Sequence, residues 1–434
     1  MSRKTLTGSA LVFAVLPAMA FAGSPPNPEK AQLTYRQYYW NEDPGSGVGP
    51  TRDEWVHALQ FDFNSRFYRD VIGIDLGVGA ADALAVGNDA NSITNLSADG
   101  DIQNPDSIAK ATTAYLKLRF GGEHHRFRAG WGKKRRDYHL YADNNTRILP
   151  AGSIGFDVGY DYKDLSLYAS RLDRFSPRNE SGWGDELQTF DGQSIDSVDL
   201  AGLASTLPAN LKLEAEYLTA RDYMDATFLN LSREFAITGN SFIAVALAHG
   251  NQRDGGDLFE EQGVPGFYPA EDDHDASFNE ISVTWHRKGH YAGVAFTNVY
   301  GSHYDRVLFA GDYGTWDSEA DNFYRFGLEG EAMAKLSVGV DLAEWGVKGL
   351  RWDGYYAHSD EADGYTGFSR REFLSFLKYR FPGQLRGLSL AWLHVNFETR
   401  GQVGPDSNKE LTFGPAGFIT HDADRIYLTY TYEL

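Results

Sequence analysis

Four cations stand at alternate positions on two neighbouring stretches of the chain. One residue separates Lys117 from Arg119, and one residue separates Arg126 from Arg128. Because successive side chains on a β-strand point to opposite faces, all four would share one face of a hairpin that turns near residues 121–125. Guanidinium and ammonium groups gathered on a water-filled wall attract anions and steer them inward. The pattern therefore predicts a basic face that handles anionic solutes.

Similar alternation occurs near the carboxyl end of the chain. Lys378 and Arg380 are separated by one tyrosine, so they would share a strand face. In the last eleven residues, Asp424–Leu434, every second residue is apolar or aromatic, and the intervening set is mostly polar and includes Arg425. A strand of this kind separates an apolar environment from a polar one. We expect the apolar face to meet lipid and Arg425 to line water.

Motifs for catalysis or metal binding are missing from the sequence. It has no G-x-S-x-G, H-E-x-x-H or Walker loop. The adjacent His124 and His125, and the pair His286 and His290, fall in expected turns, where solvated side chains fit better than a metal site. We expect no catalytic residue, metal or cofactor, and therefore no enzyme.

The amino terminus has the pattern of a secretory signal peptide. Arg3 and Lys4 precede an apolar run, Ala10–Ala20, and Ala20-Phe21-Ala22 is a small-x-small cleavage site. We expect residues 1–22 to be removed and residues 23–434 to form one domain. The chain has no cysteine, so this exported protein has no disulfides.

Composition narrows the class of protein further. The net charge of −20 argues against nucleic-acid binding. After residue 22 no apolar stretch is long enough for a transmembrane helix, and the mean hydropathy is −0.43. Outer-membrane barrels share this hydropathy because half of each strand faces water. Aromatic residues make up 14% of the chain, which agrees with aromatic girdles at the membrane surfaces.

The expected strands come in pairs joined by tight turns. One strand at Gln32–Trp40, eight hairpins and the terminal strand give eighteen. Long polar loops separate the hairpins, with one short connection at Arg221–Asp225; the long loops are expected at 41–53, 81–110, 132–152, 174–194, 250–276, 301–321, 359–368 and 398–422. Short turns alternating with long loops are typical of an outer-membrane barrel, although a secreted β-sandwich also alternates. We predict an all-β protein, a transmembrane antiparallel barrel of about 18 strands.

Several motifs resemble the OprD family of substrate-specific outer-membrane porins. The run Gly132–Gly155 resembles the family's inward-folded third loop, Thr34–Asp43 its first strand, and Lys348–Asp363 a late strand. Arg425 falls on the arginine of the family's last strand. The resemblance implies an eighteen-stranded barrel whose third loop folds inward as a constriction.

The resemblance also implies passive, selective uptake of small water-soluble nutrients through the outer membrane of a Gram-negative bacterium. In the family a ladder of basic residues guides substrate carboxylates to the constriction. Carried over by position, the lumen-lining cations are Arg36, Lys117, Arg119, Arg126, Arg128, Arg147, Lys378, Arg380 and Arg425. Arg147 has an alternative role, fixing the loop against the wall.

One departure leaves the substrate open. The next-to-last strand carries Ala391 and Leu393 where the family has basic residues, so part of the ladder is missing. Trp392, Tyr355 and Tyr356 could instead offer stacking surfaces in a chitoporin-like oligosaccharide channel, or lie in a membrane-surface girdle. A barrel with a plugged lumen that binds at the cell surface is the third alternative.

The expected partners follow from these alternatives. They are small anionic or zwitterionic solutes, outer-membrane lipid with lipopolysaccharide, and the barrel-assembly machinery, with no nucleic acid. The sequence does not distinguish a monomer from a trimer.

Overall fold

The computed structural model describes residues 29–45, 50–98, 100–122, 124–189, 192–262, 274–304, 315–404 and 420–434. The predicted signal peptide, residues 1–22, lies outside the described residues. None of the described helices is long and apolar enough to cross a membrane.

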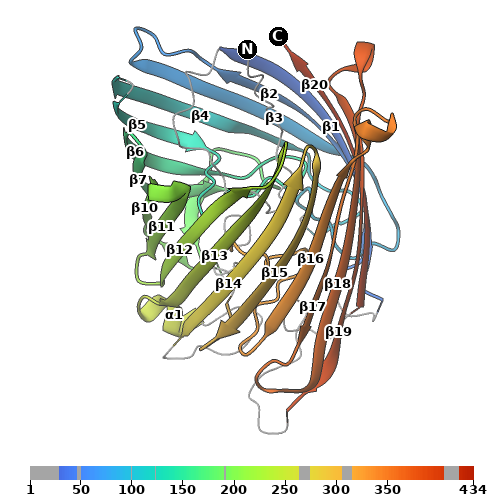
Figure 1. Ribbon diagram of the computed structural model, residues 1–434. Coiled ribbons are helices and arrows are strands. Elements are labelled where there is room, and N and C mark those ends of the chain that lie inside the picture. Colours follow the sequence, from blue (N-terminus) through green and yellow to red (C-terminus); the bar gives the residue numbers. More distant parts are fainter. Residues whose placement is uncertain are drawn as a thin grey trace.

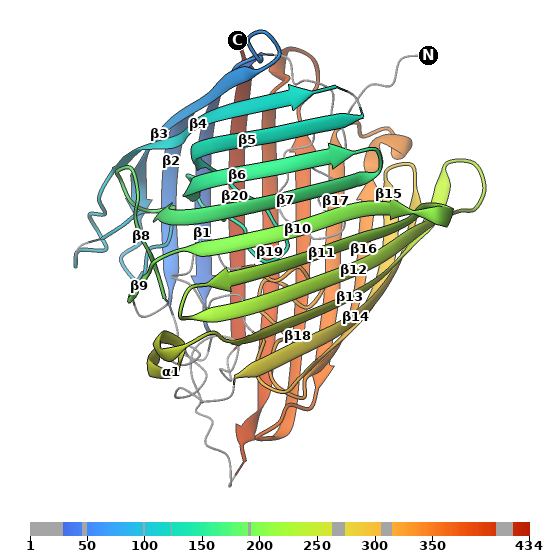
Figure 2. The same ribbon diagram turned by 90° about the vertical axis from the view of Figure 1, so that its left-hand side faces the viewer.

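Eighteen antiparallel strands of the described chain close into a barrel (Figures 1 and 2). Each strand pairs with the next, and β20 pairs with β1, so the sheet has no open edge. The strands of the wall are β1 (Lys30–Asp43), β2 (Arg52–Asn64), β3 (Ile72–Val86), β4 (Ile108–Gly121), β5 (His125–Lys134), β6 (Gly152–Tyr162), β7 (Leu165–Ser176), β10 (Val198–Leu207), β11 (Leu211–Ala220), β12 (Met224–Ala236), β13 (Ser241–Asp254), β14 (Asp275–Arg287), β15 (His290–Tyr300), β16 (Ala332–Asp341), β17 (Leu350–Asp360), β18 (Tyr365–Arg380), β19 (Leu388–Val403) and β20 (Thr420–Glu433).

The remaining elements lie in connections. Two short strands, β8 (Asp185–Gln188) and β9 (Ser194–Ile195), belong to the segment between β7 and β10. The helix α1 (Asp257–Gln262) follows β13, and three short 3-10 helices stand in turns, at Pro208–Asn210, Leu342–Trp345 and Gly383–Leu385. The start of β1 and the end of β20 lie side by side at the end of the barrel that carries the short turns, as an even strand number requires.

The two faces of each strand divide as the alternation predicts. On β20 the side chains of Ile426, Tyr430 and Tyr432 are 43%, 39% and 53% exposed, whereas Tyr427, between them, is buried. On β11 Tyr217 is exposed and Glu216 is buried. A barrel in lipid exposes its apolar side chains outward and turns polar ones to the lumen. The prediction of an antiparallel eighteen-stranded barrel is confirmed.

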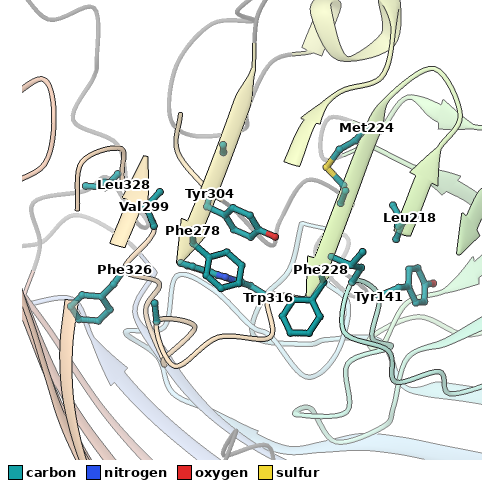
Figure 3. Close-up of a cluster of buried hydrophobic side chains, with 14 of the residues drawn as sticks. Tyr141, Leu218, Met224, Phe228, Phe278, Val299, Tyr304, Trp316, Phe326 and Leu328 are labelled. Atoms are coloured by element: carbon teal, nitrogen blue, oxygen red, sulfur yellow. The ribbon is translucent and has the colours of Figure 1, made fainter. Parts of the chain in front are cut away.

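Among the described residues, two long connections fold into the lumen. The first inward loop, residues 135–151, joins β5 to β6. The second inward loop, residues 315–331, is the segment that leads directly into β16. Their side chains form an apolar cluster with the inner faces of β11 to β14. Figure 3 shows this cluster, in which Trp316 of the second inward loop lies beside Phe278 and Tyr304.

The second inward loop corrects one predicted strand. The sequence pattern places a strand over Phe326–Trp345, but β16 covers only Ala332–Asp341. Residues before it are held inside by the buried carboxylate of Glu331, which accepts hydrogen bonds from Leu328 N at 2.9 Å and Ser359 Oγ at 2.5 Å. A buried carboxylate needs such donors, and they draw this segment off the sheet.

Aromatic side chains lie close against the inner wall where a glycine faces them. A Cβ on Gly130 would come within 2.0 Å of the Tyr115 hydroxyl, and a Cβ on Gly202 within 2.4 Å of the Tyr168 ring. On β16 a Cβ on Gly339 would lie 1.9 Å from the ring of Tyr291. Only glycine leaves room for these rings beside the backbone. The rings therefore lie against the wall and do not project into the lumen.

Candidate functional site

The first inward loop is tied to the wall at both ends. At its start, the buried Arg136 guanidinium donates to Asp157 at 2.9 and 3.0 Å and to the Ser153 carbonyl at 2.6 Å. Burial alone would lower the pKa of Arg136, but the Asp157 carboxylate raises it, so the cation persists. Near its end, the side chain of Leu149 lies against Gly79 of β3, 2.7 Å from where a Cβ would stand. Gly79 therefore makes room for the loop.

The second inward loop is held by two glutamates of the wall. Glu280 on β14 accepts hydrogen bonds from Ser318 Oγ at 2.6 Å and Glu319 N at 2.8 Å. Glu372 on β18 accepts from Phe323 N at 3.0 Å and Tyr324 N at 2.8 Å. Each carboxylate satisfies backbone donors that the lumen would otherwise leave unpaired. The loop is thereby fixed across the inner faces of β14 to β18.

A charged contact joins the two inward loops. His139 of the first hydrogen-bonds to the Asp317 carboxylate of the second, and its ring stacks on Phe228 with 4.6 Å between centroids. Burial alone would lower the pKa of His139, but the hydrogen bond and charge of Asp317, with the charges of Glu216 and Glu214, raise it to about 9. The imidazole is therefore a cation at neutral pH, and the contact is an ion pair.

The nine cations singled out in the sequence fall into three groups, of which the first is ion-paired. Lys117 lies 2.5 Å from Asp75, Arg119 pairs with Asp70, and Arg128 lies 2.8 Å from Asp161. Arg425 lies 2.5 Å from Glu42. These four face the lumen side of the wall, but carboxylates already neutralise them.

Arg425 is enclosed by two aromatic rings. Its guanidinium lies 3.7 Å from the centroid of the Trp40 ring and 4.7 Å from that of Phe323 in the second inward loop. The Glu42 carboxylate that it pairs with has no exposed area and is also bonded by Arg52 at 2.5 Å. Arg425 thus connects the closing strand to the second inward loop.

The second group consists of cations without an ion pair; Arg126 is opposite Asp161, but that carboxylate pairs with Arg128 instead. Within the part of the chain that the structure describes, Arg36, Arg126, Lys378 and Arg380 form no ion pair. Arg36 donates instead to neutral acceptors, Gln60 Oε1 at 2.6 Å and the Ile148 carbonyl at 3.2 Å. It therefore stands where the first inward loop meets the wall.

Strand register places two of these cations on one row. Arg36 is opposite Thr429 of β20, Thr429 is opposite Ser389 of β19, and Ser389 is opposite Arg380 of β18. Residues directly opposite share a face, and neighbouring strands lie roughly 5 Å apart. A polar row therefore crosses four strands of the inner wall and carries a guanidinium at each end. We call Arg36, Thr429, Ser389 and Arg380 the polar row.

Arg147, the ninth cation, stands apart from the others. It lines a pocket with residues of the segment between β7 and β10, including Glu180, Asp185 and Glu186. It is half-buried there, on the side of the first inward loop that faces this segment.

The acids that neutralise the wall were missed in the sequence. Glu42 falls in the expected loop 41–53, although β1 extends to Asp43, whereas Asp75 and Asp161 alternate with apolar residues on strands that were themselves predicted. Their strand parity was a usable signal, because an acid in a barrel strand must face water. Asp317, by contrast, lies in a long loop and carried no signal.

The three proposed stacking residues do not line the lumen together. Trp392 and Tyr356 are 44% and 47% exposed on the outer face of the barrel. Tyr355 faces inward but is buried, and its hydroxyl bonds to Glu372. Ala391 and Leu393, the positions without a basic residue, are buried on the inner face, opposite Tyr427 and Arg425 of β20.

Comparison with known proteins identifies the family. The family model described as outer membrane porin, OprD family, matches residues 27–413. The chain belongs to the OprD family of outer-membrane porins. This porin is therefore a substrate-specific channel of the Gram-negative outer membrane, and its barrel has the architecture that the sequence resemblance implied. No curated protein sequence matches the chain.

Solved structures from Pseudomonas aeruginosa share the fold of this porin. OpdK, solved with vanillate, is 19% identical with a TM-score of 0.76, covering 94% of this chain and 99% of that one. OccK9 (OpdG) is 18% identical with a TM-score of 0.77, and OccK8 (OprE) is 20% identical with a TM-score of 0.73; each covers 94% of this chain and 98% of its own. At such identities the likeness concerns the fold.

Proposed function

We propose that this porin takes up small solutes that bear a carboxylate, and that the unpaired cations of the inner wall, rather than all nine, guide them. The observation that carries the proposal is the polar row, which ends in Arg36 beside the first inward loop and in Arg380 at the turn end of β18. A guanidinium without a carboxylate partner offers two parallel donors to an incoming carboxylate.

The ion-paired cations have a different part in this proposal. Lys117, Arg128 and Arg425 each face a carboxylate at 2.8 Å or less, so a solute would have to displace that partner. Such displacement costs Coulomb energy that a free cation does not demand. OpdK was solved with vanillate, an aromatic carboxylate, which supports the same chemical class here.

A second candidate is an oligosaccharide channel of the chitoporin type. Its support in the sequence was a set of aromatic residues, of which Trp392 and Tyr356 lie on the outer face and Tyr355 is buried. The positions of these three favour the carboxylate channel.

The test is permeation of charged and neutral solutes through the purified porin. In liposome swelling, benzoate should enter faster than the neutral sugar arabinose, which does not cross lipid readily by itself, and Arg36→Gln with Arg380→Gln should remove most of the difference. Arg147→Gln serves as the matched control and should retain it. Equal rates for the two solutes in the unaltered porin, or faster entry of chito-oligosaccharides, would contradict the proposal.

A further inference from the structure

The connection between β2 and β3, residues 65–71, folds against the inner wall at the turn end of the barrel. Arg119 N donates to the Val71 carbonyl at 2.8 Å, and Gly73, which follows the connection, faces inward with the Lys117 side chain against it. Two consecutive residues of this connection, Arg69 and Asp70, have φ of 51° and 63°. Left-handed backbone is uncommon in residues other than glycine. Local hydrogen bonds close the turn, including Tyr68 N to the Ile72 carbonyl at 2.6 Å, and tertiary contacts add to them.

Those contacts are made by two cations of the wall. The Phe67 ring has the Arg119 guanidinium 4.1 Å from its centroid and the Lys117 ammonium 5.2 Å away. Arg119 also donates through Nε to the Asp70 carbonyl at 3.2 Å and pairs with the Asp70 carboxylate. As a result the Arg119 side chain is only 13% exposed, although that of Asp70 is 74% exposed.

We propose that this connection determines ion selectivity at the periplasmic mouth by covering two basic residues of β4. The Phe67 ring lies against both cations. Asp70 neutralises Arg119, and Asp75 neutralises Lys117 at 2.5 Å. Aromatic faces and carboxylates compete with any solute anion for the same donors. Anions therefore meet weaker binding sites on this side of the mouth than the count of cations suggests.

This inference rests on the proposed function, because a carboxylate that is taken up must leave the channel at the periplasmic mouth, and release requires weak binding there. Its measurement does not depend on carboxylate uptake. Single porins in planar bilayers are placed in a potassium chloride gradient, and the reversal potential gives the chloride-to-potassium permeability ratio. Arg36→Gln tests the proposed function with benzoate, whereas the variants below test the connection with chloride alone.

Phe67→Ala leaves the net charge unchanged, so it isolates the ring. We expect the chloride-to-potassium ratio to rise, because both cations gain access to water, while Phe67→Leu should give a smaller rise. Asp70→Asn should raise the ratio further, by roughly two- to fivefold, the factor expected for one unit charge at close range in water.

Two controls lie on the same rim. Tyr68→Ala removes the neighbouring aromatic ring, which is 67% exposed and contacts Arg69 rather than the wall cations. Asp164→Asn removes an acid of the β6–β7 turn. Closed barrels are first verified by their heat-modifiable migration in gels. The proposal is overturned if Phe67→Ala and Phe67→Leu match Tyr68→Ala, or if Asp70→Asn shifts the ratio no more than Asp164→Asn does.

Discussion

The enclosure of Arg425 changes how a cation on the inner wall should be interpreted. Its guanidinium lies between Trp40 and Phe323 and pairs with Glu42, whose side chain has no exposed area. Removing one partner of a buried ion pair leaves the other charge without compensation. We therefore expect Arg425 to act chiefly on stability and on the position of the second inward loop, although the family resemblance assigned it to the ladder.

Arg425→Ala should lower the free energy of unfolding by about 3 kcal/mol, because Glu42 stays buried and loses one of its two arginine partners, keeping Arg52. Urea titration of the porin in lipid vesicles measures this free energy of unfolding. Lys378→Ala, which removes a wall cation without an ion pair, should cost less than about 0.5 kcal/mol. Adding Glu42→Gln to Arg425→Ala should restore part of the loss. Equal effects of the two single alanine variants would show that Arg425 is not a structural cation.

At the scale of elements, the two inward loops act as one unit because His139 pairs with Asp317. The folded pKa of His139, about 9, lies above its ordinary value of 6.5. The contact therefore stabilises the loops fully below pH 6.5, and this contribution disappears as the pH rises through about 9.

The stability difference between the unaltered porin and His139→Gln tests this pH dependence. We expect a difference of about 1 to 3 kcal/mol at pH 6 that shrinks toward zero at pH 10. Comparing the two proteins at each pH cancels the titration of other groups. Asp317→Asn should show the same loss at pH 6. A difference that is constant from pH 6 to pH 10 would contradict the pairing.

Strands were predictable from the sequence, and loop placement only in part. Alternation fixes which face of a strand is apolar, so the inward positions of Lys117 and Arg128 could be predicted. What alternation cannot give is the partner of each cation, since Asp75 and Asp161 come close only through strand register. The resemblance located the first inward loop, whereas the second was predicted in part as strand because Phe326–Glu331 continues the apolar pattern.

At the scale of the whole molecule, the barrel separates two solvents by one strand thickness. Leu247 and Ala246 are neighbours on β13, yet Leu247 is 48% exposed on the outer face and Ala246 lines a cavity on the inner face. Charge is therefore tolerated at one position and costly at the next.

A matched pair of arginine variants tests this assignment. Leu247→Arg should destabilise the porin by about 2 to 4 kcal/mol, because the charge enters hydrocarbon. Ala246→Arg should cost less and should reduce the single-channel conductance, because the side chain enters the lumen. Unfolding in lipid vesicles and conductance in planar bilayers measure the two effects. A larger stability loss for Ala246→Arg than for Leu247→Arg would reverse the assignment of faces.

The rings that lie against Gly130, Gly202 and Gly339 have a consequence for how channels of this kind diverge. At each site an added methyl would lie within 2.4 Å of a tyrosine ring or hydroxyl, so the tyrosine would have to leave its place beside the backbone. A single substitution at one of these glycines can thus change the width and polarity of the passage. The three tyrosines beside these glycines are therefore positions at which channels of this family can vary the shape of the inner wall.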